Sequence, residues 1–142
     1  MVVEDDPYLR RDICSVLKQV GYRVSSAGNI EDVMFDHNPG LIDVLLTAVL
    51  IPGIGGIEGT AHIKKDWPHI QVVAMSEGVD DKITALHVLS AAKAAGADAL
   101  LPKPFHMPEM LKAVADVLRS KDAPVLEGAS AAQDAIDAIF AR

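Results

Sequence analysis

Polar side chains capable of chemistry follow the ends of apolar runs in this sequence. In chain order they are Glu4 and Asp5 after 1–3, Ser76 after 71–75, and Lys103 after 99–101. Paired carboxylates are ligands that a hard cation such as Mg²⁺ needs, and a lysine with a hydroxyl suits a phosphoryl group. Each residue alone has a plainer explanation, as a helix cap, a turn residue or a solvated loop charge. Together they predict a site for a phosphoryl group and a cation, provided that the runs are strands whose ends meet.

The order of apolar runs and helical patterns predicts such a sheet. Strands are expected at 1–3, 22–27, 43–51, 71–75 and 99–101, and helices at 7–20, 29–35, 57–65, 80–95 and 107–118. Strand and helix alternate five times, which indicates βαβ crossovers and a parallel α/β sheet with helices on both faces. Because parallel strands end at the same edge, the polar residues that follow them are expected to be neighbours.

The run 43–51 is expected to be the central strand. It is aliphatic and β-branched, and it stops at the Pro52-Gly53 turn. A continuous apolar run of this kind is typical of a strand buried on both faces. Ala48 lies near its carboxyl end, where open α/β folds bind their ligands, so a methyl group stands where a reactive side chain is expected.

Composition limits the class of protein. The chain has 142 residues, a net charge of −7, one cysteine and 50% hydrophobic residues, which suits one domain with a sizeable aliphatic core. The charge argues against a nucleic-acid partner, and the single cysteine indicates a reducing compartment. No apolar run reaches the roughly 18 residues that span a membrane, and acids follow 1–3 where a signal peptide needs an apolar region. A cytoplasmic protein without a membrane partner is therefore expected.

Four segments together resemble the receiver domain of two-component response regulators (CheY-like). They are Val2-Val3-Glu4-Asp5-Asp6, the run 43–56 with its Ile51-Pro52-Gly53 end, Gly96-Ala97-Asp98, and Leu101-Pro102-Lys103-Pro104-Phe105. Their order and spacing fit from Val2 to about Arg119. The resemblance implies a receiver domain at 1–120 with a flavodoxin-like five-stranded fold. It leaves 121–142 as a linker and a short Ala-rich helix.

The resemblance also implies roles for individual residues. Family members accept a phosphoryl group from a histidine kinase on an aspartate at the end of the third strand. Glu4 and Asp5 would help to hold Mg²⁺ together with the backbone carbonyl of Leu50. Lys103 would pair with the phosphoryl group, and the hydroxyl of Ser76 would move to bind it. That motion would alter the surface formed by the fourth helix, fifth strand and fifth helix.

The sequence departs from the family at the acceptor itself. Position 48 is alanine, and no acid lies between Asp43 and Glu58 to replace it. A methyl group cannot attack phosphorus, and the loss of one carboxylate should weaken Mg²⁺ binding. In addition, Leu100 stands where the family's switch aromatic usually lies. The expected function is thus a receiver module that is not an enzyme and acts by protein–protein contact.

Two origins of Ala48 stay open. The retained polar residues favour recent or engineered replacement of the acceptor in an intact regulator, whereas Leu100 and the bulky Glu77 favour natural divergence. In either case Lys103 lacks its usual carboxylate partner, and we expect it to turn toward Asp5, since an unpaired lysine in a cleft is costly.

The expected partners are a histidine kinase or phosphorelay protein and a downstream protein target. A homodimer through the fourth helix, fifth strand and fifth helix is a further expectation. The segment 121–142 is too short for an output domain, and it places Ile136, Ile139 and Phe140 on one side of its expected helix. The competing classes are a flavodoxin-like small enzyme or cofactor-binding protein that uses Asp5 and Lys103, and a purely structural adaptor.

Overall fold

A five-stranded parallel sheet forms the centre of the protein. The computed structural model describes residues 1–36, 38–78 and 82–121. The strands lie in the order β2-β1-β3-β4-β5, and every pairing is parallel. Their bounds are β1 Val2–Val3, β2 Ser26–Ala27, β3 Val44–Ala48, β4 Gln71–Ser76 and β5 Ala99–Pro102. The predicted α/β, flavodoxin-like architecture is confirmed.

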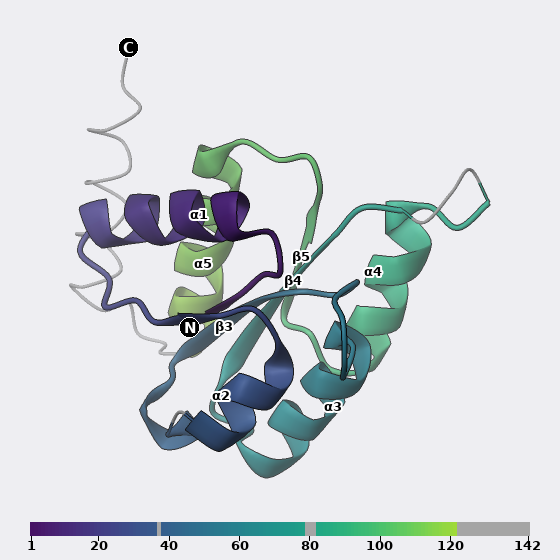
Figure 1. The fold of residues 1–142 in the computed structure, drawn as a ribbon, viewed down its shortest axis with the longest axis horizontal. Coiled ribbons are helices and arrows are strands. Elements are labelled where there is room, and N and C mark those ends of the chain that lie inside the picture. Colours follow the sequence, from purple (N-terminus) through teal and green to yellow (C-terminus); the bar gives the residue numbers. More distant parts are fainter. Residues whose placement is uncertain (37, 79–81, 122–142) are drawn as a thin grey trace.

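Helices cover both faces of the sheet. Figure 1 shows α1 and α5 on one side and α2, α3 and α4 on the other. The bounds are α1 Pro7–Gln19, α2 Ile30–Asp36, α3 Gly56–Asp66, α4 Ala85–Ala94 and α5 Met107–Lys121, and a 3₁₀ turn, Pro39–Leu41, precedes β3.

The alternation of side chains along the strands builds two apolar layers. Leu46 of β3 packs with residues of α1 and α5, whereas its neighbour Leu45 packs with residues of α2 and α3. Both side chains are buried. The long apolar run therefore reflects a strand that is covered on both faces, as expected.

Helix α1 is fixed at both ends by residues that the sequence identifies. The carboxylate of Asp6 accepts hydrogen bonds from the backbone N–H groups of Tyr8 and Leu9, at 2.9 and 3.3 Å, and Pro7 occupies the first turn. Gly21 follows the helix with φ of +101°, a conformation that favours glycine. These signals direct the chain from the end of β1 into the helix.

The expected boundaries need correction at three elements. β3 covers Val44–Ala48 rather than the predicted 43–51. β2 contains two residues rather than the predicted six at 22–27. α4 begins at Ala85 rather than at Asp80, because Thr84 caps it in a reciprocal arrangement with the His87 side chain. Residues 79–81, the predicted linker after Lys121 and the predicted helix 130–141 lie outside the described residues. Within the described part of the chain, none of the helices is long and apolar enough to cross a membrane.

Candidate functional site

The carboxyl-terminal edge of the sheet collects most of the predicted site residues. Glu4 follows β1, Ala48 ends β3, Ser76 ends β4 and Lys103 follows β5. The strand registers place these ends next to one another, since Val3 pairs with Thr47, Ala48 with Met75, and Ser76 with Pro102. The prediction that the topology brings these residues to one edge is confirmed.

Glu4 and Lys103 form a buried ion pair. The Nζ atom of Lys103 lies 2.8 Å from Oε2 of Glu4, and the two side chains are 15% and 2% exposed. The other oxygen, Oε1, accepts a hydrogen bond from the backbone N–H of Asp6 at 3.2 Å. The Glu4 carboxylate therefore has a partner for each oxygen, as burial of a charge requires.

The expectation that Lys103 turns toward Asp5 is wrong in its partner. Asp5 is exposed to solvent, whereas Glu4 is 1% exposed. Glu4 directly follows β1, so its side chain is held at the sheet edge, and Asp5 already belongs to the loop that enters α1. The carboxylate nearest the strand end therefore pairs with the lysine.

The ion pair crosses the ends of two other strands. β1 and β5 are separated by β3 and β4, so their axes are about three spacings of 4.8 Å, or roughly 14 Å, apart. A contact of 2.8 Å between Glu4 and Lys103 requires both side chains to extend across this gap. The pair therefore bridges the sheet edge at which β3 and β4 also end.

Ala48 lies in a closely packed backbone corner. It is 2% exposed, and its carbonyl oxygen accepts a hydrogen bond from Oγ1 of Thr47 at 3.0 Å. The following loop returns against it, because the N–H of Gly56 donates to the carbonyl of Val49 at 2.9 Å. A Cβ atom on Gly56 would lie 2.4 Å from the Ala48 carbonyl oxygen, so α3 can begin this close to β3 only with glycine at its first position.

Ser76 makes a local hydrogen bond in this structure. Its buried hydroxyl donates to the carbonyl of Glu77 at 2.7 Å. The Ser76 carbonyl in turn accepts from the backbone N–H of Lys103 at 2.9 Å, which fixes the start of the loop after β5. Glu77 itself is exposed, so its side chain does not fill the site.

The two other predicted site residues have different surroundings. Leu50 is 45% exposed in the loop after β3. Leu100 is partly buried and packs with Val88, Leu89 and other apolar residues on the α4 side of the sheet. Leu100 is thus held as an aliphatic contact between β5 and α4.

Glu31 supports the site from α2, and the sequence reasoning missed it. Its carboxylate accepts a hydrogen bond from the backbone N–H of Ile54 in the loop after β3. This backbone hydrogen bond lowers the pKa of Glu31. Gly53 lies directly beneath the carboxylate with φ of +82°. The approach of a glycine turn to an acid on another helix has no short-range sequence signal.

Asp98, in the Gly96-Ala97-Asp98 segment, fixes the start of β5. Its carboxylate accepts from the backbone N–H of Val72 at 2.8 Å and pairs with Nζ of Lys64 at 3.0 Å. These contacts join α3, β4 and β5. Asp98 thus positions the strand that delivers Lys103.

The donor set for Mg²⁺ is incomplete in this arrangement. Among the described residues, no three His, Cys, Asp or Glu side chains lie close enough together to hold a metal ion. Glu4 is already paired with Lys103, and Ala48 supplies no side-chain oxygen. A hard cation that takes oxygen ligands would find one uncommitted carboxylate, that of Asp5. The residues present therefore do not fit a strong Mg²⁺ site.

Comparison with known proteins identifies the family. The family model "Response regulator receiver domain" matches residues 1–139. The chain is 29% identical over 133 residues to the DNA-binding transcriptional regulator NtrC of Azospirillum brasilense, covering 94% of this chain and 27% of that protein. It is 28% identical over 124 residues to the phosphate regulon transcriptional regulatory protein PhoB of Escherichia coli K12, covering 84% and 51%. The chain thus spans about a quarter to a half of these relatives.

Solved structures agree with this result. The BeF₃-activated receiver domain of DrrB superposes with a TM-score of 0.70 at 28% identity, covering 82% of this chain and 93% of that one. The receiver domain of NtrX from Brucella abortus gives a TM-score of 0.74 at 20% identity, with coverage of 84% and 97%, and shows the shared fold. The chain belongs to the response regulator receiver domain family.

Proposed function

We propose that this chain is a receiver module of a two-component phosphorelay that cannot itself be phosphorylated. In the family resemblance, the end of β3 carries the phosphoacceptor aspartate, and Ala48 occupies that position. The module would therefore act by contact with other proteins and not as an enzyme. The proposed receiver extends over 1–120, and 121–142 would be a linker and a short helix.

The observation that carries this proposal is the ion pair between Glu4 and Lys103. In a receiver with an aspartate at position 48, three acids and one lysine would share this edge. Here the Nζ atom of Lys103 lies 2.8 Å from the carboxylate of one of the remaining acids, Glu4, and Ala48 supplies only a methyl group. The surroundings of a phosphorylation site are kept, while the nucleophilic oxygen is missing.

We propose weak Mg²⁺ binding for the same reason. Asp5, Glu4 and the backbone carbonyl of Leu50 are the family-type ligands that this sequence retains. Of these, Glu4 would have to leave Lys103 to bind a cation. Competition between ammonium and cation for one carboxylate lowers the affinity for the cation.

The proposed partners follow from the family and not from a bound molecule. A histidine kinase or phosphorelay protein would dock at the Glu4–Lys103 edge, and a downstream protein would bind the face formed by α4, β5 and α5. Leu86 of α4 is 72% exposed, which supports a contact role for that helix, either with a target or with a second copy. The proposed function is the same whether Ala48 arose by natural divergence or by replacement of the acceptor.

One experiment tests the proposal directly. The chain and its Ala48→Asp variant are incubated with acetyl phosphate and Mg²⁺, and the intact masses are measured. We expect a phosphoryl adduct only on Ala48→Asp, which would show a competent site with one missing group. An Ala48→Asn variant controls for the change in size, because its amide does not form the acyl phosphate. Phosphorylation of the unmodified chain would overturn the proposal.

The same comparison tests metal binding. If Ala48→Asp completes the site, Mg²⁺ should raise its melting temperature more than that of the unmodified chain or of Ala48→Asn. An equal Mg²⁺ effect on all three proteins would contradict the proposed loss of affinity.

A further inference from the structure

A basic groove lies between α1 and the outer edge of β2, and it has a volume of about 470 Å³. The residues of this α1–β2 groove that matter here are Arg10, Arg11, Cys14, Lys18, Val24 and Ser26. Among the described residues that line it there are three cations and no acid, although the whole chain has 20 Asp and Glu residues against 13 Lys and Arg residues. A groove of one sign of charge on a protein of the opposite sign indicates a surface that attracts a negatively charged partner.

The three cations are only partly engaged by the protein itself. Nη1 of Arg10 donates to the Glu4 carbonyl at 2.7 Å, which anchors the guanidinium and leaves its other N–H groups for a further acceptor. Arg11 lies 3.4 Å from the Asp12 carboxylate, and the two side chains are 71% and 57% exposed, so this pair contributes little free energy. Lys18 is exposed in the last turn of α1. A carboxylate that enters the groove can therefore bind these cations at small cost.

The other wall of the groove is an open strand edge. β2 is the last strand in the order, and in the described part of the chain its one neighbour is β1. On the β1 side, the Ser25 carbonyl accepts from the N–H of Val2 at 2.8 Å. The Ala27 carbonyl likewise accepts from the N–H of Glu4 at 3.1 Å. Because backbone groups alternate in direction along a strand, those of Ser26 point outward, where a further strand can pair with them.

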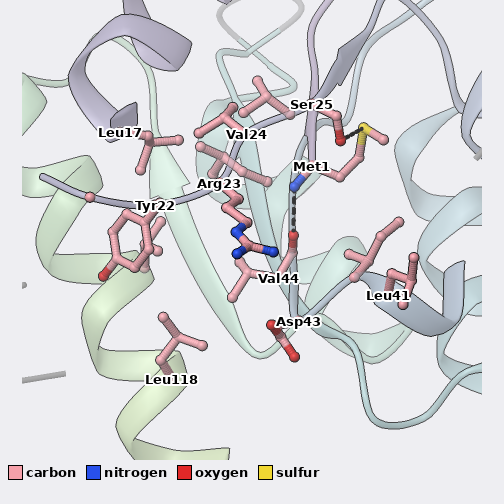
Figure 2. Close-up of a pocket in the computed structure, with 15 residues that line it drawn as sticks. Met1, Leu17, Tyr22, Arg23, Val24, Ser25, Leu41, Asp43, Val44 and Leu118 are labelled. Atoms are coloured by element: carbon pink, nitrogen blue, oxygen red, sulfur yellow. Dashed lines mark hydrogen bonds between the residues drawn. The ribbon is translucent and has the colours of Figure 1, made fainter. Parts of the chain in front are cut away.

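The side chains of this segment alternate between the two faces of the sheet. Ala27 packs into the layer of α2 and α3, whereas Val24 packs into the layer of α1 and lines the groove together with Ser26. Figure 2 shows the intervening Ser25 turned toward Met1, where its hydroxyl lies 3.8 Å from Sδ. A strand added along β2 would therefore turn every second side chain toward the α1 face.

The cations on α1 match that alternation in length. Arg10 and Lys18 are eight residues apart on the helix, which corresponds to about 12 Å along its axis. Side chains on one face of an extended segment recur about every 6.7 Å, so the first, third and fifth residues cover roughly 13 Å. Acids at these three positions can face Arg10 or Arg11 at one end of the groove and Lys18 at the other.

We propose that the α1–β2 groove binds an extended acidic segment of a partner protein, which adds to β2 as a further strand. Carboxylates at every second residue of that segment would face Arg10, Arg11 and Lys18. Its backbone would pair with the outward N–H and carbonyl groups of Ser26, the form of recognition in which a peptide extends a sheet. This inference does not depend on Ala48 or on whether the module can be phosphorylated.

Cys14 reports occupancy of the groove in the unmodified protein. It is the one cysteine of the sequence, it is partly buried, and it lines the groove. Its alkylation by the neutral reagent iodoacetamide is followed by intact mass, with and without the end-capped peptide Glu-Val-Glu-Val-Glu. We expect the saturating peptide to slow alkylation at least fivefold.

A peptide of the same composition is the control for that experiment. In Val-Glu-Glu-Glu-Val, the acids on one face span only about 7 Å, so at the same concentration it should slow alkylation less than twofold. Equal protection by the two peptides, or no protection by the alternating one, would overturn the proposal. Stronger protection by an oligothymidylate than by the alternating peptide would assign the groove to nucleic acid and would overturn it as well.

Charge variants on the two faces of the sheet locate the binding site. Arg11→Gln with Lys18→Gln removes two charges from the groove. Lys65→Gln with Lys93→Gln removes two exposed charges from α3 and α4 on the other side of the sheet. With a fluorescent alternating peptide, anisotropy should show at least tenfold weaker binding for the first pair and less than twofold for the second. Equal weakening by both pairs would show unspecific attraction and contradict the proposal.

Methylation of the peptide backbone separates strand addition from attraction between charges alone. N-methyl groups remove backbone donors and keep every charge. Since the N–H groups of a strand alternate in direction, either the Glu set or the Val set would face β2, but not both. We expect methylation of one set to weaken binding at least tenfold and methylation of the other set to weaken it clearly less. Unchanged binding of both methylated peptides would rule out pairing with β2 and overturn the proposal.

Discussion

The ammonium of Lys103 and the carboxylate of Glu4 meet at 2.8 Å, although β3 and β4 lie between their two strands. The carboxylate is the more deeply buried partner, with a side chain 2% exposed against 15% for the lysine. This asymmetry decides which member of the pair can be removed at lower cost. The lysine can reach water when its partner is lost, whereas the carboxylate cannot.

Lys103→Met should therefore destabilise the protein more than Glu4→Gln. Leaving a buried charge without its partner costs about 3–5 kcal/mol, and we expect Lys103→Met to approach that range and Glu4→Gln to cost about half as much. Urea unfolding followed by circular dichroism measures both. The double variant should recover part of the loss, and a larger cost for Glu4→Gln would show that the carboxylate is not the constrained partner.

Gly56→Ala should damage the corner between β3 and α3. The new Cβ would lie 2.4 Å from the Ala48 carbonyl oxygen and 2.6 Å from Cα of Val49. Both are backbone atoms, so relieving the overlap requires α3 to shift away from the end of β3. We expect a loss of about 3 kcal/mol or more in the free energy of unfolding.

Gly55→Ala is the matched control for that change. Its Cβ would meet nothing closer than the Val49 carbonyl oxygen at 3.8 Å, and its φ of −67° suits any residue. Because Gly55 is the N-cap of α3, where alanine is less favourable than glycine, alanine there should cost no more than about 1 kcal/mol, well below the loss at Gly56. Equal losses at the two neighbouring glycines would contradict the packing described here.

Thr60→Val should be neutral or stabilising. The Thr60 hydroxyl is buried and lacks a hydrogen-bond partner among the described residues. Its burial therefore costs desolvation free energy that no hydrogen bond offsets, and an isosteric methyl group would remove up to about 1 kcal/mol of this cost. Thr47→Val is the contrasting variant, because the buried Thr47 hydroxyl donates to the Ala48 carbonyl at 3.0 Å. It should lose about 1 kcal/mol. Thermal unfolding of both should move the melting temperature in opposite directions, and a loss at Thr60 would point to a hidden partner.

Tyr22 should make stability fall at alkaline pH. Burial raises the pKa of Tyr22 above its usual value of 10.0, with Arg119 opposing the shift. A raised folded-state pKa means that the unfolded chain loses its phenolic proton first, so stability is fully present below about pH 10 and declines as the pH rises through the folded value.

Melting temperatures between pH 8 and pH 11 test this expectation. Tyr22→Phe should flatten the alkaline decline, while Tyr8→Phe, at a residue 70% exposed, should leave it unchanged. The same decline in all three proteins would assign the pH dependence to other groups.

The local signals of the sequence determined the elements that meet at the site. The Asp6-Pro7 start of α1, the glycine stop at Gly21 and the apolar run that contains β3 are short-range features. The structure confirms the first two, and it confirms the strand over Val44–Ala48. Parallel strands necessarily deliver their ends to one edge. The family resemblance and the alanine at position 48 are likewise properties of the sequence alone.

Tertiary structure decided which groups touch. Sequence spacing could not distinguish Glu4 from Asp5 as the partner of Lys103, because the choice depends on which of two adjacent carboxylates is held at the strand end. The contact of Glu31 with the loop after β3 was equally hidden. Such contacts join residues far apart in the chain, and their energies depend on burial and direction, which local propensity does not encode.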